Sequence, residues 1–320
     1  MASDAEQQAA EAETTAAFDA ARDAGASGQD VAISRILPDA GRWAACARHV
    51  LQLDLGDDPE KASALAYSDF GGGEGDWPVL SGYGTLIADM AQSLNIRLAT
   101  PVYDIAEDGA RVRVQTPAGD LRAKAVVVTV STNVLSSGAI RFAPGPAADM
   151  AQMVTHLPCG AFEKVAYTVT HLPEALGDRQ HLTVDPGDGA PAIDFKLMKG
   201  APPMIVSTIA GTPARALMAM PRTGRIAFVR DRLCLALGSD VAKTITGAAC
   251  TNWLHDPLIL GCYSHATPGY GQTRRDMIAA DTGRIGFAGE AFSPGHQATA
   301  HGAYLSGRHV AARLTGLISA

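Results

Sequence analysis

The chain has 320 residues, of which 47% are hydrophobic and 18% charged, and its formal net charge is −7. This composition is typical of a folded α/β protein with two lobes and excludes the disordered and fibrous classes. The negative charge argues against nucleic acid and anionic membrane surfaces as partners, and no window approaches the roughly 18 consecutive apolar residues of a membrane helix. The five cysteines form no CxxC or zinc pattern. They favour reduced thiols, a cytoplasmic location and no metal site.

The first third of the chain predicts helices. Residues 4–25 are rich in Ala and Glu, residues 43–53 carry an apolar face, and residues 61–65 suit a third, short helix. The glycine-rich residues 71–76 do not fit G-x-G-x-x-G, because Asp76 stands where the third glycine is required and no strand precedes them. We expect a flexible loop there.

The middle of the chain alternates between helix and strand patterns. A helix is predicted at 85–93 and another at 224–237. Strands are predicted at 96–98, 102–105, 111–116, 121–123, 125–130, 159–170, 181–184, 193–197 and 204–210. The β-branched run 125–130 is of the kind that is buried on both faces of a mostly parallel sheet.

Residues 282–314 carry the clearest signal for a site. Residues 284–288 predict a short buried strand, Gly289 permits a tight turn, and Glu290 stands where the strand ends. After a polar loop, a helix is expected from Thr299, which suits its N-cap. A carboxylate and a helix N-terminus at one crevice can hold an anion or an electron-rich ring. On the residues alone, an ordinary strand–loop–helix unit is the alternative.

This stretch resembles the C-terminal flavin motif of the flavin-containing amine oxidase family, which includes monoamine and polyamine oxidases. The resemblance rests on FAGE at 287–290 and HGAYLSG at 301–307. It implies that FAD is the cofactor and that Gly289 and Glu290 lie at its ribityl–pyrophosphate part. It also implies that the helix start, Thr299, Ala300 and Gly302, faces the flavin ring.

A second stretch, WLHDPLILGCYS at 253–264, resembles the family segment that brings an aromatic side chain to the flavin. Tyr263 would form one wall of the slot that holds the amine. Cys262 falls where monoamine oxidases carry a cysteine linked to flavin, although an ordinary small buried residue is the alternative. The second wall falls on Thr299, which is not aromatic and indicates a bulkier substrate or an altered specificity.

Two further residues enter the site through the resemblance. Lys164 interrupts an apolar strand, and its residue pattern alone favours a solvated lysine. By resemblance it is the lysine that holds a water against flavin N5, so Lys164 and Tyr263 are the predicted catalytic residues. Val102 begins the V-x-x-I strand of the family's cofactor lobe and is predicted to bind the cofactor.

The implied fold class is α/β (α+β), with an incomplete FAD/NAD(P)-binding Rossmann-like lobe and an amine-oxidase-type substrate lobe of a mixed sheet and covering helices. Residues 78–135 and 276–320 would form the FAD lobe, and residues 1–77 and 136–275 the substrate lobe. The family's βαβ unit with G-x-G-x-x-G has no counterpart in this sequence. Three interpretations stay open: a truncated gene model, a split enzyme whose partner chain supplies the unit, or a remnant that does not bind FAD.

The resemblance implies an FAD-dependent oxidoreductase that acts on a small amine. Hydride would pass from the amine C–H to flavin N5, the imine would hydrolyse, and O2 would reoxidise the flavin with release of H2O2. The alternatives are a desaturase or protoporphyrinogen-oxidase-like flavoprotein and a non-catalytic subunit that does not bind FAD by itself.

Overall fold

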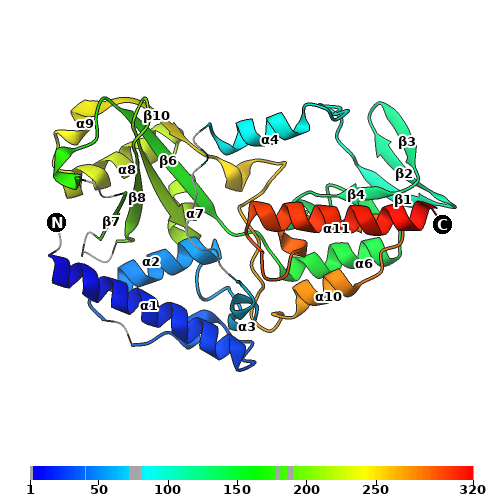
Figure 1. Cartoon of the computed structure of the whole chain (residues 1–320), viewed down its shortest axis with the longest axis horizontal. Coiled ribbons are helices and arrows are strands. Elements are labelled where there is room, and N and C mark those ends of the chain that lie inside the picture. The colour runs from blue at the N-terminus through cyan, green and yellow to red at the C-terminus, as the bar shows by residue number, and fades with distance from the viewer. Residues whose placement is uncertain are drawn as a thin grey trace.

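The computed structural model describes residues 3–39, 41–71, 79, 81–177, 180–185, 187 and 190–319. Its α-helices are α1 (Asp4–Ala26), α2 (Ala44–Leu55), α3 (Ala64–Ser68), α4 (Tyr83–Ala91), α5 (Thr132–Ser136), α6 (Pro146–Met153), α7 (Gly211–Met218), α8 (Arg222–Leu237), α9 (Val241–Thr244), α10 (Thr273–Ala279) and α11 (Ala300–Ser319). Its strands are β1 (Asp104–Asp108), β2 (Arg111–Thr116), β3 (Gly119–Ala123), β4 (Val126–Val128), β5 (Arg141–Phe142), β6 (Phe162–Val169), β7 (His181–Val184), β8 (Ile193–Met198), β9 (Met204–Ala210), β10 (Ile245–Cys250) and β11 (Ile285–Phe287). The two termini lie at opposite ends of the molecule (Figure 1).

A five-stranded sheet in the order β10-β6-β9-β8-β7 forms one half of the molecule. Alternate residues of β6 are buried, and Val165 and Tyr167 pack with Ile205 of β9 in its core. Each neighbouring pair of strands is antiparallel, so the mixed sheet predicted for this half is wrong in its strand directions. The short connections from β7 to β8 and from β8 to β9 explain the difference, because hairpins join antiparallel neighbours.

The helices α1, α2 and α3 form a small core of their own beside this sheet (Figure 1). Ala21, Leu51 and Tyr67 meet in it, one from each helix. Ser3 caps α1 by accepting from the N–H of Glu6, whose carboxylate accepts in return from the Ser3 N–H. The helices predicted at 4–25 and 43–53 are confirmed, and the third begins three residues later than expected.

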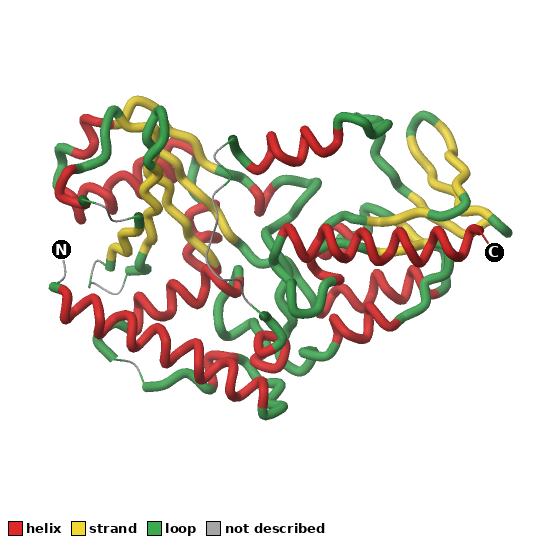
Figure 2. The backbone as a smooth tube through the Cα atoms, in the orientation of Figure 1, coloured by secondary structure: helices red, strands yellow, loops and turns green. Residues whose placement is uncertain are grey.

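The other half contains a four-stranded sheet, β3-β2-β1-β5, and the parallel pair β4–β11. All three residues of β11 are buried, and Val310 and Leu314 of α11 pack against this strand. The helix α11 runs along the strands of this half (Figure 2). A Cβ at Gly286 would lie 2.4 Å from Cγ1 of Val310, which explains the glycine. The predicted hairpin, the C-terminal strand and the helix that follows it are all confirmed.

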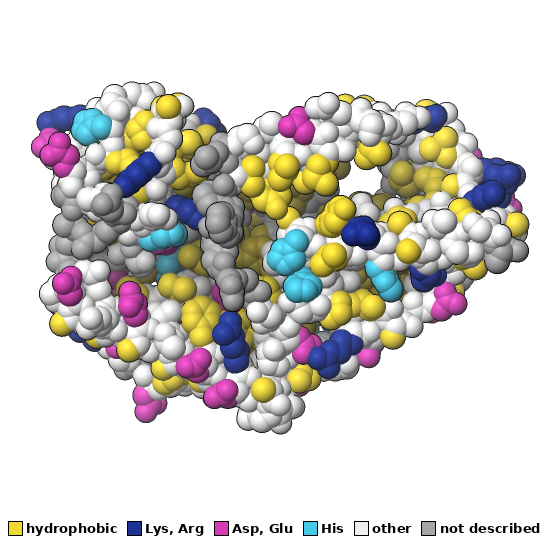
Figure 3. Space-filling view, in the orientation of Figure 1, with side chains coloured by type: hydrophobic (Ala, Val, Ile, Leu, Met, Phe, Trp, Pro, Cys, Tyr) yellow, Lys and Arg dark blue, Asp and Glu magenta, His cyan; other side chains and the backbone are white. Residues whose placement is uncertain are grey.

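One part of this half has few partners. No residue of α4 is buried, and Ile96 and Leu98, which follow it, are 56% and 83% exposed. The strand predicted at 96–98 is wrong, because these residues pair with no strand in the part of the chain that the structure describes. The strand predicted at 125–130 shortens to β4, which pairs with β11 alone among the described strands and leaves Val127 39% exposed. Figure 3 shows apolar side chains gathered beneath α4, beside a hollow.

The glycine-rich loop predicted at 71–76 lies, apart from Gly71, outside the described residues. None of the helices in the described ranges has the length and apolar character needed to cross a bilayer.

Candidate functional site

Glu290 connects three segments at the point where the predictions placed a cofactor site. Its Oε1 accepts from the N–H of Ser264 at 2.9 Å, and its Oε2 accepts from the Ser264 hydroxyl at 3.1 Å and the Ala298 N–H at 2.8 Å. The chain reaches Glu290 through Gly289, whose φ of 146° favours glycine. A carboxylate offers about four acceptor positions, and protein donors take three of them here.

Ser264 is in turn held by a buried cation. Both terminal nitrogens of Arg274 lie 3.2 Å from its hydroxyl, and one of them also donates to the carbonyl of Ala291 at 2.7 Å. Burial lowers the pKa of the Arg274 guanidinium, while the negative charge of Glu290 acts in the opposite direction. Arg274 therefore holds in place Ser264 and Ala291, the two residues next to Glu290 in the network and in the chain.

The first turn of α11 is capped as predicted. The Thr299 hydroxyl accepts from the N–H of Gly302 at 3.0 Å and donates to the carbonyl of His296 at 2.7 Å. A Cβ at Gly302 would come 2.0 Å from that carbonyl oxygen, so only glycine fits. The earlier N–H groups of the helix, those of Ala300 and His301, have no acceptor within the helix and can bind an anionic or carbonyl group. This end of α11 lies at the junction of the two halves (Figure 1).

Tyr263 lies between the C-terminal end of α2 and β6. Its hydroxyl donates to the carbonyl of Leu53, and its ring centroid is 5.8 Å from that of Phe162. Burial raises the pKa of Tyr263 well above its usual range, so the phenol stays neutral. Gly56 lies against it, because a Cβ there would come 2.7 Å from the ring.

The thiol of Cys262 faces Gly56. Its Sγ lies 3.6 Å from the Gly56 carbonyl oxygen, and burial raises the pKa of the thiol well above its usual range. Such a thiol is a poor nucleophile and packs as a small apolar group.

Lys164 lies on the exposed side of β6, and its Nζ is 5.7 Å from the centroid of the Phe162 ring. Since Phe162 also contacts Tyr263, both predicted catalytic residues lie near the same ring. About 100 residues of sequence separate them. Val102 packs against the core cluster that contains Ile105 and Val112 of the β1–β2 hairpin.

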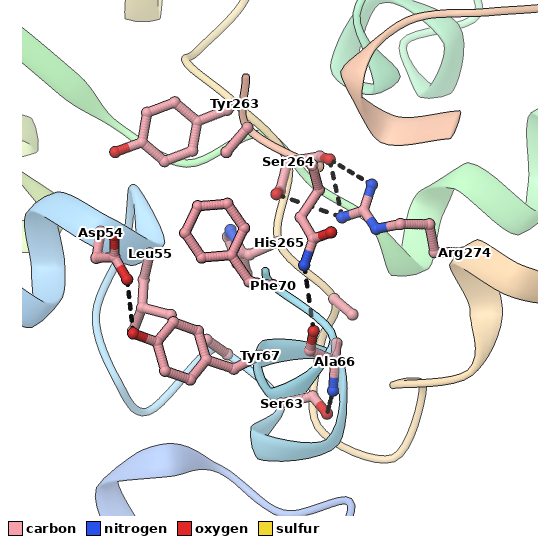
Figure 4. A pocket seen from close by; sticks show the side chains of 14 residues that line it. Asp54, Leu55, Ser63, Ala66, Tyr67, Phe70, Tyr263, Ser264, His265 and Arg274 are labelled. Carbon is pink, nitrogen blue, oxygen red and sulfur yellow. Dashed lines mark hydrogen bonds between the residues drawn. The ribbon is translucent and has the colours of Figure 1, made fainter. Parts of the chain in front are cut away.

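A small cavity opens beside Tyr263 (Figure 4). The rings of Tyr67, Phe70 and Tyr263 and the carboxylate of Asp54 surround it. His265 and Gln297 also line the cavity, and each has a buried polar atom without a hydrogen-bond partner, Nδ1 of His265 and Oε1 of Gln297. Burial lowers the pKa of His265 to about 4, which leaves the imidazole neutral near pH 7.

The residues present fit the ring end of a flavin. A Cβ at Gly289 would meet no atom within 4 Å, so open space adjoins the end of β11 and the start of α11. The N–H donors at the start of α11 suit the electron-rich edge of an isoalloxazine. The sequence contains no G-x-G-x-x-G turn of the kind that binds the pyrophosphate of a dinucleotide.

Sequence reasoning missed several residues of this region. Ser264 stands inside a stretch that the resemblance covers, but a serine in a loop carries no signal of its role. Arg274 lies in the short helix α10, where an arginine is ordinarily exposed, and it is 5% exposed here. Asp54, His265 and Gln297 come from three separate segments, and only tertiary structure brings them to one cavity.

Comparison with known proteins places this arrangement in context. A family model described as flavin containing amine oxidoreductase matches residues 43–315. Lysine-specific histone demethylase 1 homolog 3 of Oryza sativa subsp. indica is 29% identical over 245 residues, which are 73% of this chain and 30% of that protein. Polyamine oxidase 4 of Oryza sativa subsp. japonica is 31% identical over 235 residues, 72% of this chain and 47% of that protein. The chain thus spans less than half of either relative's length.

Solved structures share the fold. A triple mutant of putrescine oxidase, from a structure-based redesign of cofactor binding, matches with a TM-score of 0.78 at 17% identity over 97% of this chain and 76% of that chain. Cyclohexylamine oxidase from Brevibacterium oxydans matches with a TM-score of 0.73 at 18% identity, over 99% of this chain and 75% of that chain.

Proposed function

Because the chain belongs to the family of flavin containing amine oxidoreductases, we propose that it forms the substrate side and part of the cofactor side of an FAD-dependent amine oxidase. A flavin bound here would supply the hydride acceptor at N5, and O2 would be the final oxidant, giving H2O2. The hydride would come from the C–H beside the amine nitrogen, and the resulting imine would hydrolyse. The hydrogen bonds by which Glu290 joins Ser264, next to Tyr263, to Ala298, just before α11, carry this proposal.

Each residue of the crevice has a role in the proposal. The N–H groups at the start of α11 bind the electron-rich edge of the ring. Glu290 holds the loop before that helix in place by accepting a hydrogen bond from the Ala298 N–H. The neutral phenol of Tyr263 forms an apolar wall that excludes water and faces the amine. Lys164, near the ring of Phe162, holds a water molecule for the reaction with O2.

No strong general base is required of the protein, because only the neutral amine would react. Cys262 binds the cofactor side as a packing residue in this proposal, without a covalent link, because its Sγ faces Gly56. We further propose the two lobes set out above, with residues 78–135 and 276–320 on the flavin side and residues 1–77 and 136–275 on the substrate side. A cytoplasmic location would suit the five free cysteines.

We propose that a partner chain carrying a glycine-rich βαβ unit completes the flavin lobe. Among the described strands β4 pairs with β11 alone, and α4 exposes an apolar face, with Ile87 52% and Met90 57% exposed; both observations support this. Strands of parallel sheets are ordinarily buried on both faces and paired on both sides, except at the sheet edge. A strand paired with β4 and a helix beneath α4 would bury these groups and supply the pyrophosphate site.

The test combines the purified chain, FAD and the glycine-rich βαβ unit of a family member. The mixture is given small aliphatic amines without oxygen while the absorbance of the oxidised flavin is followed. We expect the absorbance to bleach with an amine and to return when O2 is admitted, with formation of H2O2. Bound flavin that no amine reduces would overturn the proposed activity.

A further inference from the structure

A second cavity lies in the half of the molecule that contains α11. Its volume is about 290 Å³, and residues of α10, of α11 and of the segment that follows β11 line it. Figure 1 shows α11 beside α6 and α10 in this half. Among the described residues, none lines both this cavity and the one beside Tyr263, and none with a role in the proposed reaction borders it.

The interior of this cavity is apolar. Met150 of α6 and Met277 of α10 line it and are each 2% exposed. Phe287 and Phe292 add two aromatic rings, whose centroids lie 6.0 Å apart. Methionine side chains are unbranched and adapt their shape to what they contact. An apolar tail placed here would leave water and pack against these side chains, which favours its binding.

Arg313 of α11 brings a positive charge to this apolar space. Its Nη1 donates to the carbonyl of Gly283 at 3.0 Å, and its Nη2 would lie 3.5 Å from a Cβ at Gly286, so the guanidinium lies over β11. Nη2 has no hydrogen-bond acceptor within the described ranges, while the guanidinium has five N–H donors in all. The cation is therefore held in place and still has donors for a ligand.

Further donors border the same cavity. His309 precedes Arg313 by one helical turn on α11, and His296 lines the cavity from the loop before that helix. An imidazole carries at least one N–H donor in either protonation state. The Ser293 side chain is 5% exposed, and its hydroxyl has no hydrogen-bond partner in the part of the chain that the structure describes.

The charge balance of the lining favours an anion. No carboxylate occurs among the described residues that line the cavity. Asp281 lies 3.5 Å from Nη1 of Arg313, but its side chain is 88% exposed, so water screens its charge. A carboxylate ligand would meet a guanidinium, which matches it in shape and charge, whereas an ammonium group would be repelled.

We propose that this cavity binds a medium-chain aliphatic carboxylate, with its carboxylate on Arg313 and its tail against Met150, Met277 and Phe292. The volume sets the size of the ligand, since 290 Å³ holds roughly ten non-hydrogen atoms at about 30 Å³ each. Arg313 is then the residue that selects an anion, and the methionines and rings select the tail. The inference does not depend on the proposed function, because neither flavin nor amine takes part in it.

The test titrates octanoate into the full chain labelled with ¹³C at the methionine methyl groups and follows the NMR signals. We expect the methyl signals of Met150 and Met277 to shift and that of Met218, 3% exposed on α7 in the other half, to stay in place. Octan-1-ol keeps the tail and lacks the charge, and butanoate keeps the charge and shortens the tail. Each should bind at least about tenfold more weakly than octanoate.

Variants of one side chain test the assignment of the cation. Arg313→Met should weaken octanoate at least about tenfold without changing the affinity for octan-1-ol, and Arg313→Lys should restore most of the loss. Arg308→Met, which changes an exposed arginine beside Tyr304 on the same helix, is the matched control. Unmoved Met150 and Met277 signals, equal affinity for octanoate and octan-1-ol, or unchanged octanoate binding by Arg313→Met would overturn the inference. If Arg313→Met does not fold, the comparison of the three ligands on the unchanged chain decides.

Discussion

Ser264 donates two hydrogen bonds to Glu290, one from its backbone N–H to Oε1 at 2.9 Å and one from its hydroxyl to Oε2 at 3.1 Å. The pair joins the segment that carries Tyr263 to the end of β11, across 26 residues of sequence. The segment that carries Tyr263 and the loop before α11 are thus fixed relative to each other by one carboxylate.

Replacing Glu290 with alanine should therefore affect both stability and the cofactor. The N–H groups of Ser264 and Ala298 would lose their acceptor, and we expect the free energy of unfolding to fall by about 2 kcal/mol. In the protein completed with a βαβ unit, flavin content should fall as well. Urea denaturation and flavin absorbance measure the two effects, with Glu174→Ala as the control. Unchanged flavin content would show that Glu290 serves the fold alone.

Substitution of Lys164 with methionine tests its predicted role. The side chain is exposed on β6, so the stability of the fold should change by less than about 0.5 kcal/mol. If Lys164 holds a water at the flavin, reoxidation of the reduced completed enzyme by O2 should slow by about 100-fold. Stopped-flow absorbance gives this rate, and Lys243→Met, on the surface helix α9, is the control. An unaltered rate contradicts the assignment.

Two buried histidines should make stability depend on pH. Burial lowers the pKa of His49 and of His265 from 6.5 to about 4. The unfolded chain therefore binds protons before the folded protein does, so the stability is fully present above pH 6.5 and is lost as the pH falls toward 4. Between about pH 7 and pH 5 each histidine should account for a loss of about 2 kcal/mol.

Denaturation at several pH values measures this slope, and His49→Leu should remove about half of it. Asp58 does not interfere in this range. Burial alone would raise the pKa of Asp58, but hydrogen bonds from Thr212 and Gln52 lower it to about 2, so this carboxylate stays ionised. A pH-independent free energy between pH 7 and pH 5 would contradict the assignment of both imidazoles as neutral.

The chain by itself should bind FAD weakly or not at all. The printed sequence lacks the glycine-rich turn that supplies the pyrophosphate contacts. Titration of FAD into the purified chain, followed by flavin fluorescence, should show no stoichiometric complex. A yellow chain that keeps one flavin through gel filtration would contradict this expectation.

Positive charges placed on α4 should leave the folding of the chain unchanged but prevent the flavin lobe from being completed. Ile87→Lys and Met90→Lys change side chains that are already more than half exposed, so the melting temperature of the chain alone should hardly move. Binding of the βαβ unit, and FAD uptake with it, should be lost. Leu235→Lys, on α8 and 62% exposed, is the matched control. Normal assembly of the α4 variants would show that the apolar face of α4 stays exposed to solvent in the assembled protein.

The sequence predicted most of the elements that local pattern can define. The strand before Glu290, the cap at Thr299 and the β2–β3 hairpin follow from alternation, turn residues and capping chemistry, which neighbours in sequence supply. The segment 96–98 also has a strand pattern, but a strand needs a partner, and none of the described strands pairs with it.

The residues of the candidate site that lie in the family motifs could be predicted from the sequence. The residues that distant segments bring to the site could not. No pattern marks Arg274 as buried, because its burial depends on carbonyl acceptors from Ala291 and on Ser264. The strand directions of the five-stranded sheet likewise depend on which strands become neighbours, and this is decided by packing and connection length.

The hydrogen bond from Tyr263 to the carbonyl of Leu53 has a consequence for how specificity can change. The hydrogen bond holds the Tyr263 ring to the last turn of α2. A Cβ at Gly160 would come 2.1 Å from the carbonyl oxygen of Gly56, so the chain just before β6 is in direct contact with the end of α2. A small displacement of α2 along its axis would carry the phenol with it. If Tyr263 lines an amine slot as proposed, substitutions in the α1–α2 contact would change the width of that slot without reaching it. Selection for other amines should then recover such substitutions as readily as changes in the lining.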